Sequence, residues 1–162
     1  MKISCRILLL ISLLQVIACH NPVVFEQTKD INTTAWHKDS IVQMQFVPQD
    51  TVKAYDIFFL IRNDNAYPYA NLFLIAKMDN GKQTLVDTLE YAMADEKGRW
   101  LGSGIWDLKE SKLIYKQNYR FKDTIPVKIS LQQAVRKSGQ ILGDETLPGI
   151  KTVGIIIEEA NK

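Results

Sequence analysis

The sequence predicts an all-β fold: a single antiparallel β-sandwich of the Greek-key or jelly-roll kind, with one short helix near residues 130–138. Three observations lead to this prediction. Roughly eight short segments are rich in β-branched and aromatic residues, turn-forming residues separate them, and only one segment has helical spacing. Strands at such short intervals, without a helix between each pair, are typical of sandwiches rather than of alternating α/β sheets.

The first 18 residues predict a lipoprotein signal peptide. Lys2 and Arg6 give a positive start, and residues 7–17 form an apolar block. A helix of this block would be roughly 16 Å long, about half the hydrocarbon thickness of a bilayer, so it is too short to span one. The block ends in "VIAC", with Ala18 directly before Cys19, and this ending resembles the bacterial lipobox. The alternative is an ordinary secretory signal that happens to precede a cysteine.

The lipobox resemblance implies that Cys19 becomes a lipid anchor. In such signals the chain is cut before the cysteine, whose thiol receives a diacylglycerol and whose new amine is usually acylated as well. Two or three acyl chains hold a protein durably at a membrane, since each buried methylene contributes about 0.8 kcal/mol. His20 stands where an aspartate would favour the inner membrane, and no acidic cluster follows it. We therefore expect a periplasm-facing protein of the outer membrane, with residues 19–35 as its lipidated tether and lead-in.

The chain that remains after removal of residues 1–18 is electrically neutral and has no free thiol. The sequence has 20 Lys and Arg against 18 Asp and Glu, and the signal takes away Lys2 and Arg6 and no acid. Neutrality without a Lys/Arg run argues against nucleic acid as a partner. Cys5 leaves with the signal and Cys19 is acylated, so no thiol is left for a disulfide, a zinc site or a nucleophile. Residues 36–162 suffice for one domain with a buried core.

The strands of the first half follow from alternation and turn chemistry. The segment "IVQMQFV" alternates apolar and polar residues, as a half-buried strand does, whereas "AYDIFFLIRN" is apolar enough to be covered on both faces. The segment "DNGK" predicts a hairpin with a type I′ turn, because Asn-Gly tolerates positive φ angles. The predicted strands are residues 41–47, 54–63, 69–78 and 83–93, with the hairpin turn at 79–82.

The second half is less regular. Residues 95–112 are predicted to form a short strand or bend and a long loop, and 115–121 and 123–130 a pair of strands. The short helix is expected to begin at Ser130 as N-cap, with Gln133 three residues on, as in a capping box. Its apolar side would be Leu131, Ala134 and Val135, and Gly139 would end it. The closing segment, 150–159, is apolar enough for a central strand.

No set of residues predicts catalysis, a metal site or a cofactor. His37 is the one histidine available to a folded site, and no G-x-S-x-G elbow accompanies it, so we expect a solvated histidine in a turn. The "GSG" at 102–104 lacks the spacing of a phosphate-binding loop, and no H-E-x-x-H motif occurs. Neighbouring acids are expected to be exposed rather than paired for glycoside hydrolysis. They are Asp95 with Glu96, Asp144 with Glu145, and Glu158 with Glu159.

Aromatic residues gather in two nearby segments, "GRWLGSGIWDL" and "NAYPYAN". Trp100, Trp106, Tyr67 and Tyr69 could form a platform that stacks on sugar rings or on the side chains of a partner, since indoles are frequent in interface hot spots. The alternative is that both tryptophans are core or bend residues, because most of the 15 aromatic residues of a small β domain must lie inside. We favour the core or bend interpretation.

Several segments together resemble the H-type gliding-motility lipoproteins (GldH) of Bacteroidota. They are the lipobox, "YPYANLFLIAK", "DTLEYAMADEKGRWLGSGIWDLKE", "ISLQQAVR" and "LPGIKTVGIIIE". The resemblance covers nearly the whole chain, and its most specific part is the run that begins "DTLEY". It implies a non-enzymatic lipoprotein of the cell envelope, associated with machinery that moves cells over surfaces by carrying adhesins along the outside. It implies no functional residue other than the acylated Cys19.

Three functional hypotheses follow. The first is an interaction protein: a lipid-anchored domain that docks on other envelope proteins by a β-face or an unpaired edge strand. The second is a carbohydrate- or peptidoglycan-binding module that uses the aromatic residues. The third and weakest is a hydrolase built on His37 or an acid pair. The positions of Trp100 and Trp106 separate the first two, because sugar binding requires coplanar rings that face solvent in a groove.

Overall fold

The computed structural model of the protein describes residues 22–136, 139 and 143–160. Within these ranges the chain forms ten strands and no helix, so it offers no helix long and apolar enough to cross a membrane. The strands are β1 (Val23–Asp30), β2 (Ala35–His37), β3 (Val42–Phe46), β4 (Tyr55–Asn63), β5 (Asn71–Asp79), β6 (Thr84–Ala92), β7 (Lys109–Tyr119), β8 (Val127–Gln133), β9 (Thr146–Pro148) and β10 (Ile150–Glu159).

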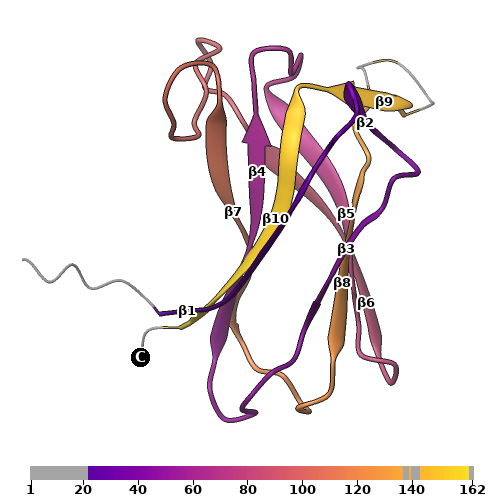
Figure 1. The fold of residues 1–162 in the computed structure, drawn as a ribbon, viewed down its shortest axis with the longest axis vertical. Coiled ribbons are helices and arrows are strands. Elements are labelled where there is room, and N and C mark those ends of the chain that lie inside the picture. Colours follow the sequence, from indigo (N-terminus) through magenta and orange to yellow (C-terminus); the bar gives the residue numbers. More distant parts are fainter. Residues whose placement is uncertain (1–21, 137–138, 140–142, 161–162) are drawn as a thin grey trace, which may run out of the picture.

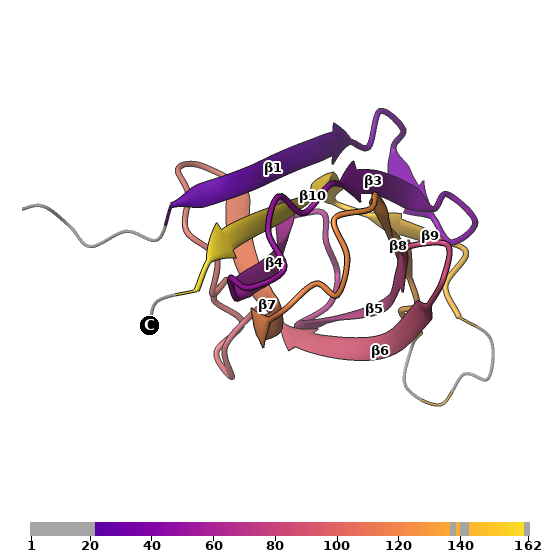
Figure 2. The same cartoon turned by 90° about the horizontal axis from the view of Figure 1, so that it is seen from below.

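The strands form two antiparallel sheets that face each other (Figures 1 and 2). The first sheet has the order β1-β10-β4-β7, and the second has the order β3-β8-β5-β6. A separate two-stranded ribbon, β2 with β9, lies at the upper end of Figure 1. Every pairing among these strands is antiparallel. The prediction of an all-β antiparallel sandwich is therefore confirmed.

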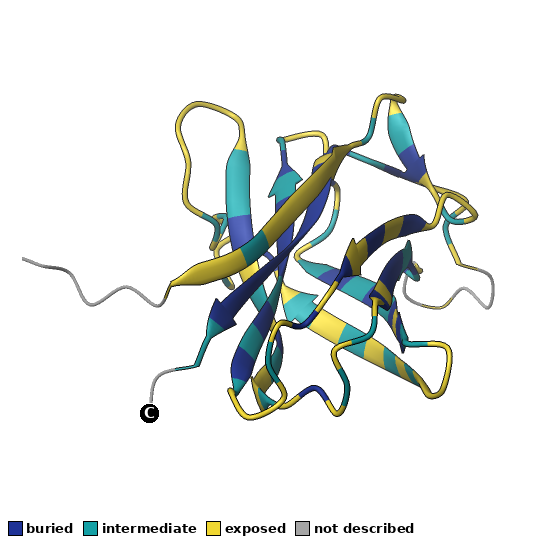
Figure 3. Cartoon of the chain, turned by 60° about the horizontal axis from the view of Figure 1, so that its bottom comes forward, coloured by how far each residue is buried: buried dark blue, intermediate teal, exposed yellow. Residues whose placement is uncertain are grey.

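The core lies between the two sheets and is centred on β4 and β10. The two strands are in register through the pairs Ile57↔Ile157, Phe59↔Ile155 and Ile61↔Val153, and all six side chains are fully buried. Since burying one such side chain contributes about 1.5–3 kcal/mol, this ladder is a main source of stability. Figure 3 shows β10 buried beside the exposed β1, as expected for an inner strand next to an edge strand.

The predicted helix near residues 130–138 is wrong. Ser130 to Gln133 belong to β8, which lies between β3 and β5 and pairs with both. The segment "VKISLQQ" also has period two, with Val127, Ile129 and Leu131 on the core face, and two neighbouring strands satisfy its backbone. Residues 137–138 of the expected helix lie outside the described residues.

Three smaller details also differ from expectation. Residues 23–30, which we placed in the lead-in, form β1 and pair with β10. The strands predicted over 115–121 and 123–130 overlap β7 and β8, but these lie in different sheets. The predicted β5–β6 hairpin is present, but only Gly81, and not Asn80, takes a positive φ. That pattern matches a glycine at the first central position of a type II′ turn.

The two sheets are joined at one side along the edge strands β6 and β7. Tyr115 donates a hydrogen bond to Asp87 Oδ2 at 2.9 Å, and Lys116 Nζ lies 2.9 Å from the same oxygen. Tyr91 donates a hydrogen bond to the carbonyl oxygen of Ile114 at 2.8 Å. Burial by itself would raise the pKa of Asp87, but Lys116 and Tyr115 hold it below its usual value. We refer to Asp87, Tyr91, Tyr115 and Lys116 as the β6–β7 seam.

Candidate interaction site

The segment that connects β6 to β7, residues 93–108, projects from one end of the sandwich (Figure 1). β7 begins at Lys109, which is in register with Asn63 at the end of β4. β1 begins at the other end of the same sheet, because Val23 pairs with Glu158 and Glu158 pairs with Asp56. Asp56 and Asn63 are seven residues apart on β4, which corresponds to roughly 23 Å. The 93–108 segment and the start of β1 thus lie at opposite ends of the domain.

The far part of this segment is a tight, well-bonded loop. Ser103 and Glu110 exchange two backbone hydrogen bonds, of 2.9 and 2.7 Å, which close the loop at its base. Gly104 has a φ of +151°, and a Cβ there would lie 2.2 Å from the carbonyl oxygen of Leu108. Lys109 Nζ adds a hydrogen bond to the carbonyl oxygen of Gly104. The "GSG" of the sequence is therefore a loop-closing element in which the second glycine is sterically required.

The tip of this loop presents apolar side chains to solvent. Trp106 is 89% exposed and Ile105 78%, and Leu101 and Leu108 are exposed as well. We call these four residues the apolar loop tip. Trp106 also has a φ of +56°, a left-handed conformation that costs a bulky L-residue on the order of 1–2 kcal/mol. Such a cost is uncommon outside sites where it serves a function, so the exposed, strained indole marks the loop as a candidate site.

The other three predicted aromatic residues form a packed cluster instead of a platform. Tyr67 is buried, and its ring lies 6.1 Å from that of Trp100 at 43° and 5.9 Å from that of Tyr69 at 73°. Burial raises the pKa of Tyr67, and its hydroxyl donates a hydrogen bond to the carbonyl oxygen of Asn71. The rings are inclined to one another, and none of them is in ring contact with Trp106. Among the described residues these aromatics therefore form no coplanar row.

Tyr69 and Trp100 are both half-buried and both use their polar atoms in hydrogen bonds. Tyr69 donates a hydrogen bond to Asp144 Oδ2, and burial together with this carboxylate raises the pKa of Tyr69 to about 12. Trp100 Nε1 donates to Asn65 Oδ1 at 3.0 Å, and Asn65 Nδ2 donates to Asp107 Oδ1 at 2.8 Å. Asn65 thus ties the aromatic cluster to the base of the apolar loop tip. The core interpretation fits Trp100, whereas Trp106 is a turn residue that points outward.

A second fixed turn precedes the loop. Asp95 accepts hydrogen bonds from the backbone amides of Lys97 and Arg99, and its carboxylate lies 2.7 Å from Arg99 Nη2. The backbone amide and guanidinium of Arg99 lower the pKa of Asp95. Asp95 therefore has a structural role in the turn. An isolated antiparallel β-bridge between Ala94 and Trp100 flanks the same turn.

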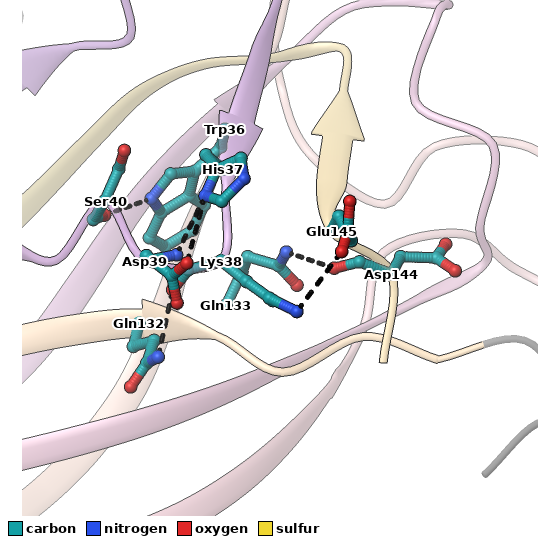
Figure 4. Close-up of polar contacts among 9 residues, drawn as sticks. All are labelled: Trp36, His37, Lys38, Asp39, Ser40, Gln132, Gln133, Asp144 and Glu145. Carbon is teal, nitrogen blue, oxygen red and sulfur yellow. Dashed lines mark hydrogen bonds and ion pairs between the residues drawn. The ribbon is translucent and has the colours of Figure 1, made fainter. Parts of the chain in front are cut away.

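His37 takes part in a local turn at the β2–β9 ribbon (Figure 4). The backbone amide of Asp39 donates to His37 Nδ1 at 3.2 Å, and the Asp39 carboxylate lies 3.7 Å from the same nitrogen. Next to it, the fully buried Trp36 donates a hydrogen bond to the carbonyl oxygen of Ser40. The turn is held to β8 by Gln132, which donates to the carbonyl oxygen of Lys38 at 2.9 Å. These contacts give His37 a turn position of the kind expected from the sequence.

The remaining acid pairs also make structural contacts. Glu145 lies 3.6 Å from Lys38, and Glu159 lies 2.5 Å from Lys53. Glu158 is buried and not exposed as expected, and its carboxylate lies 2.7 Å from Lys112 Nζ. Within residues 22–136, 139 and 143–160, no three His, Cys, Asp or Glu side chains come close enough together to hold a metal ion.

Sequence reasoning singled out Trp106 but missed Leu101, Ile105 and Leu108. The available signal was the composition of "WLGSGIWDL", in which two groups of large apolar residues flank the glycines at 102 and 104. Neither that composition nor its spacing states which side chains face solvent, because this depends on the closure at Ser103 and Glu110.

Comparison with known proteins assigns the chain to a family. The family described as GldH lipoprotein matches residues 23–157. A gliding motility lipoprotein GldH homolog from Christiangramia forsetii is 44% identical over 146 residues, 89% of this chain and 88% of that protein. The gliding motility lipoprotein GldH of Flavobacterium johnsoniae is 42% identical over 160 residues, 98% of this chain and 99% of that protein.

Among solved structures, the infectious bursal disease virus VP2 subviral particle overlaps at a TM-score of 0.30 and 14% identity, covering 88% of this chain and 37% of that one. The family match and both relatives span nearly the whole chain, as the sequence resemblance did. The chain belongs to the GldH lipoprotein family, whose named members are lipoproteins of gliding motility.

Proposed function

We propose that this membrane-anchored envelope lipoprotein is a non-enzymatic docking component of the gliding-motility machinery. It binds another envelope protein through the apolar loop tip, with Trp106 as the central contact. The single observation that carries this proposal is an indole that is 89% exposed and held at a φ of +56° in a closed loop. A partner pocket that covers Trp106 gains the burial of a large rigid side chain whose conformation is already fixed.

The anchor of this protein is the acylated Cys19. Its family consists of lipoproteins, and "VIAC" places Cys19 at the position that lipoprotein signals acylate. Residues 1–18 are removed, and the mature protein faces the periplasm from the outer membrane, in accord with His20 and the absence of an early acidic cluster. An anchor at one end of the sheet and the apolar loop tip at the other let the domain hold a membrane and a protein partner at once.

The loop accounts for docking better than the strand edges do. β1 is an edge strand and is exposed almost throughout, but its exposed large apolar side chains are only Val23 and Val24. The apolar loop tip has four exposed apolar side chains within eight residues. Interface energy concentrates in a few large side chains, tryptophan foremost, that enter a dry pocket. Trp106 meets that description, whereas a glycan platform of coplanar rings has no counterpart in the Tyr67, Tyr69 and Trp100 cluster.

The test compares two exposed apolar residues in the acylated protein. Trp106→Ala removes the proposed contact, and Val86→Ala removes a 58% exposed side chain on β6 that is far from the loop. Both variants are recovered from crosslinked intact cells, and the envelope proteins bound to each are quantified by mass spectrometry. We expect Trp106→Ala to lose at least about 2 kcal/mol of binding, roughly 30-fold in affinity, and to impair surface spreading.

Val86→Ala should bind and spread like the parent protein. Because Trp106 is almost fully exposed, its replacement should leave folding intact, and a melting curve checks this directly. A Trp106→Ala protein that folds normally and keeps its partners and its spreading would contradict the proposal. So would equal losses in the two variants.

A further inference from the structure

The end of the sandwich where β1 begins has exposed aliphatic side chains of its own. Val23 and Val24 start β1, Val47 follows β3, and Val52 lies in the loop between β3 and β4. All four are exposed, and Val52 is 79% exposed. We call these residues the valine rim. Single exposed valines are ordinary on a protein surface, so the rim matters only because its members share one end of the domain.

A shared cleft and a fixed loop bring members of the rim near one another. Val24 and Val47 both line an open cleft of about 420 Å³ between β1 and the β3–β4 loop. Asp50 Oδ1, also on the cleft, accepts hydrogen bonds from the backbone amides of Val52 and Lys53, which fixes the loop. Figure 3, which brings this end of the domain forward, shows the start of β1 and the loops at this end as largely exposed.

The start of β1 is firmly attached to the body of the domain. The carbonyl oxygen of Pro22 accepts a hydrogen bond from the backbone amide of Glu159 at 3.1 Å. The Glu159 side chain in turn lies 2.5 Å from Lys53 Nζ, at the base of the β3–β4 loop. The chain that leaves the domain at Pro22 therefore departs from a fixed point beside the valine rim.

The distance from that point to the anchor is short. Cys19 is three residues before Pro22, and an extended chain spans at most 3.3–3.6 Å per residue, so their Cα atoms are at most about 11 Å apart. Val24 is only two residues further on. An acylated Cys19 has its chains in the bilayer, so this short tether keeps the start of β1 close to the lipid headgroups.

The charges on the cleft do not oppose such a contact. Lys53 is paired with Glu159, and the remaining ionised group on the cleft is the Asp50 carboxylate, which is occupied by backbone amides. No excess of Lys or Arg is present in the cleft that would bind anionic lipids selectively. A contact here rests on apolar burial and should depend little on lipid charge or salt.

We propose that the valine rim rests in the headgroup region of the lipid bilayer and fixes the orientation of the anchored domain. The inference rests on the acylated anchor of the proposed function and adds a second, non-covalent membrane contact to it. With the rim on the bilayer, the apolar loop tip lies at the opposite end of the first sheet, roughly 23 Å away along β4. The contact thus presents Trp106 to a partner beyond the lipid surface.

The test uses an environment-sensitive fluorophore on a single introduced cysteine in the acylated full-length mature protein. Cys19 is blocked by acylation and Cys5 is removed, so the introduced thiol is the only one. Val52→Cys probes the rim, and Ile105→Cys is a matched control at the other end, since the two side chains are 79% and 78% exposed. Both are reconstituted in phosphatidylcholine vesicles, with and without a lipid that carries a quencher below the headgroup.

We expect the probe at residue 52 to be blue-shifted and quenched by the lipid, and the probe at residue 105 to give the spectrum it has in water. Adding an anionic lipid or salt should change neither result. Equal spectra at both positions on vesicle-bound protein would overturn the inference. A blue-shifted spectrum of the probe at residue 52 in protein without vesicles or detergent would also overturn the inference. It would mean that an acyl chain of the protein itself occupies the cleft.

Flotation of the vesicles separates this outcome from a failure of the anchor. Protein that floats with the vesicles but leaves residue 52 in water contradicts only the valine rim contact. Protein that does not float at all contradicts the acylated anchor of the proposed function. A Val52→Asp variant provides the complementary measurement: it should float as well as the parent protein, yet lose lipid quenching of a probe placed at residue 47.

Discussion

Replacing Asp87 by alanine should cost the domain about 3 kcal/mol of unfolding free energy, because one carboxylate joins the two sheets at the β6–β7 seam. Asp87 Oδ2 accepts a hydrogen bond from Tyr115 at 2.9 Å and pairs with Lys116 at the same distance. Losing a charged acceptor and leaving the buried Tyr115 hydroxyl without a partner costs about 2–3 kcal/mol. The ion pair, with both side chains about a quarter exposed, adds at most about 1 kcal/mol.

The assay is urea unfolding at pH 7 of a chain that begins at residue 20 and therefore has no acylation site. Tyr115→Phe should cost about 1 kcal/mol, since the ring still stacks on Phe59 at 4.7 Å and Asp87 keeps Lys116. The double variant Asp87→Ala with Tyr115→Phe should cost less than Asp87→Ala alone, because the hydroxyl that was left unpaired is gone. Strict additivity of the two losses, or a loss below about 0.5 kcal/mol for Asp87→Ala, would refute this view of the seam.

The same carboxylate predicts a pH dependence with a definite sign. The folded state holds the pKa of Asp87 below its usual value, so its contribution is present above an unfolded pKa of about 3.9. It is lost as the pH falls through the lower pKa of the folded state. Asp87→Asn should therefore be less stable than the parent protein at pH 7, and the difference should shrink below about pH 4. A constant difference across this range would contradict the ion-pair assignment.

Three further results are expected. Gly149→Ala should cost more than about 3 kcal/mol of unfolding free energy, because its Cβ would lie 2.1 Å from the backbone nitrogen of Tyr67. Gly98→Ala is the control: it has a similar φ of +75° but open space around it, and should cost only about 1 kcal/mol. Equal losses of the two variants in urea unfolding would be inconsistent with the close approach. Burial and Asp87 raise the pKa of Tyr91 to about 12. The neutral Tyr91 hydroxyl therefore stabilises the fold fully below about pH 10, and this stabilisation is lost between about pH 10 and 12. Tyr91→Phe should flatten the alkaline decline in unfolding free energy, and an unchanged decline would exclude Tyr91 as a source. Trp106→Gly should relieve the strain of the left-handed backbone at this residue and abolish docking. After the entropy cost of glycine is subtracted, the unfolding free energy should rise by up to about 1 kcal/mol. A lower unfolding free energy would show that the indole supports the fold.

The sequence predicted the parts of the fold that have strong local signals. The hairpin of β5 and β6 followed from Asn-Gly between alternating segments, and the inner positions of β4 and β10 followed from apolar residues on both faces. In both cases the residues that determine the element lie within the element. Local reasoning therefore sufficed for the two central strands and for the sandwich class.

The errors occurred where distant partners decide the structure. Residues 130–133 fit a helix start as well as a strand, and pairing with β3 and β5 selects the strand. β1 is exposed at every residue except the half-buried Phe25, so "VVFEQTKD" has no alternation to reveal it, and only its pairing with β10 makes it a strand. Pairings between strands that are far apart in the sequence leave no signal in either segment alone.

The candidate site was predictable in composition but not in arrangement. Trp100, Tyr67 and Tyr69 do come together, but as inclined rings packed against the core. Trp106 separates from them because Gly104 and the bonds between Ser103 and Glu110 turn the loop outward. That exposure is a property of a closed loop in three dimensions, and the sequence shows only that the loop contains glycine and tryptophan.

The most direct measurement of the docking role is site-specific photo-crosslinking from position 105 in intact cells that make the acylated protein. Ile105 is exposed and adjacent to Trp106, so a crosslinker there reports whatever covers the apolar loop tip. A defined adduct with one envelope protein should form, should vanish when Trp106→Ala is added, and should persist when Val86→Ala is added instead. No adduct at position 105, or one that survives the loss of Trp106, would contradict docking through this loop.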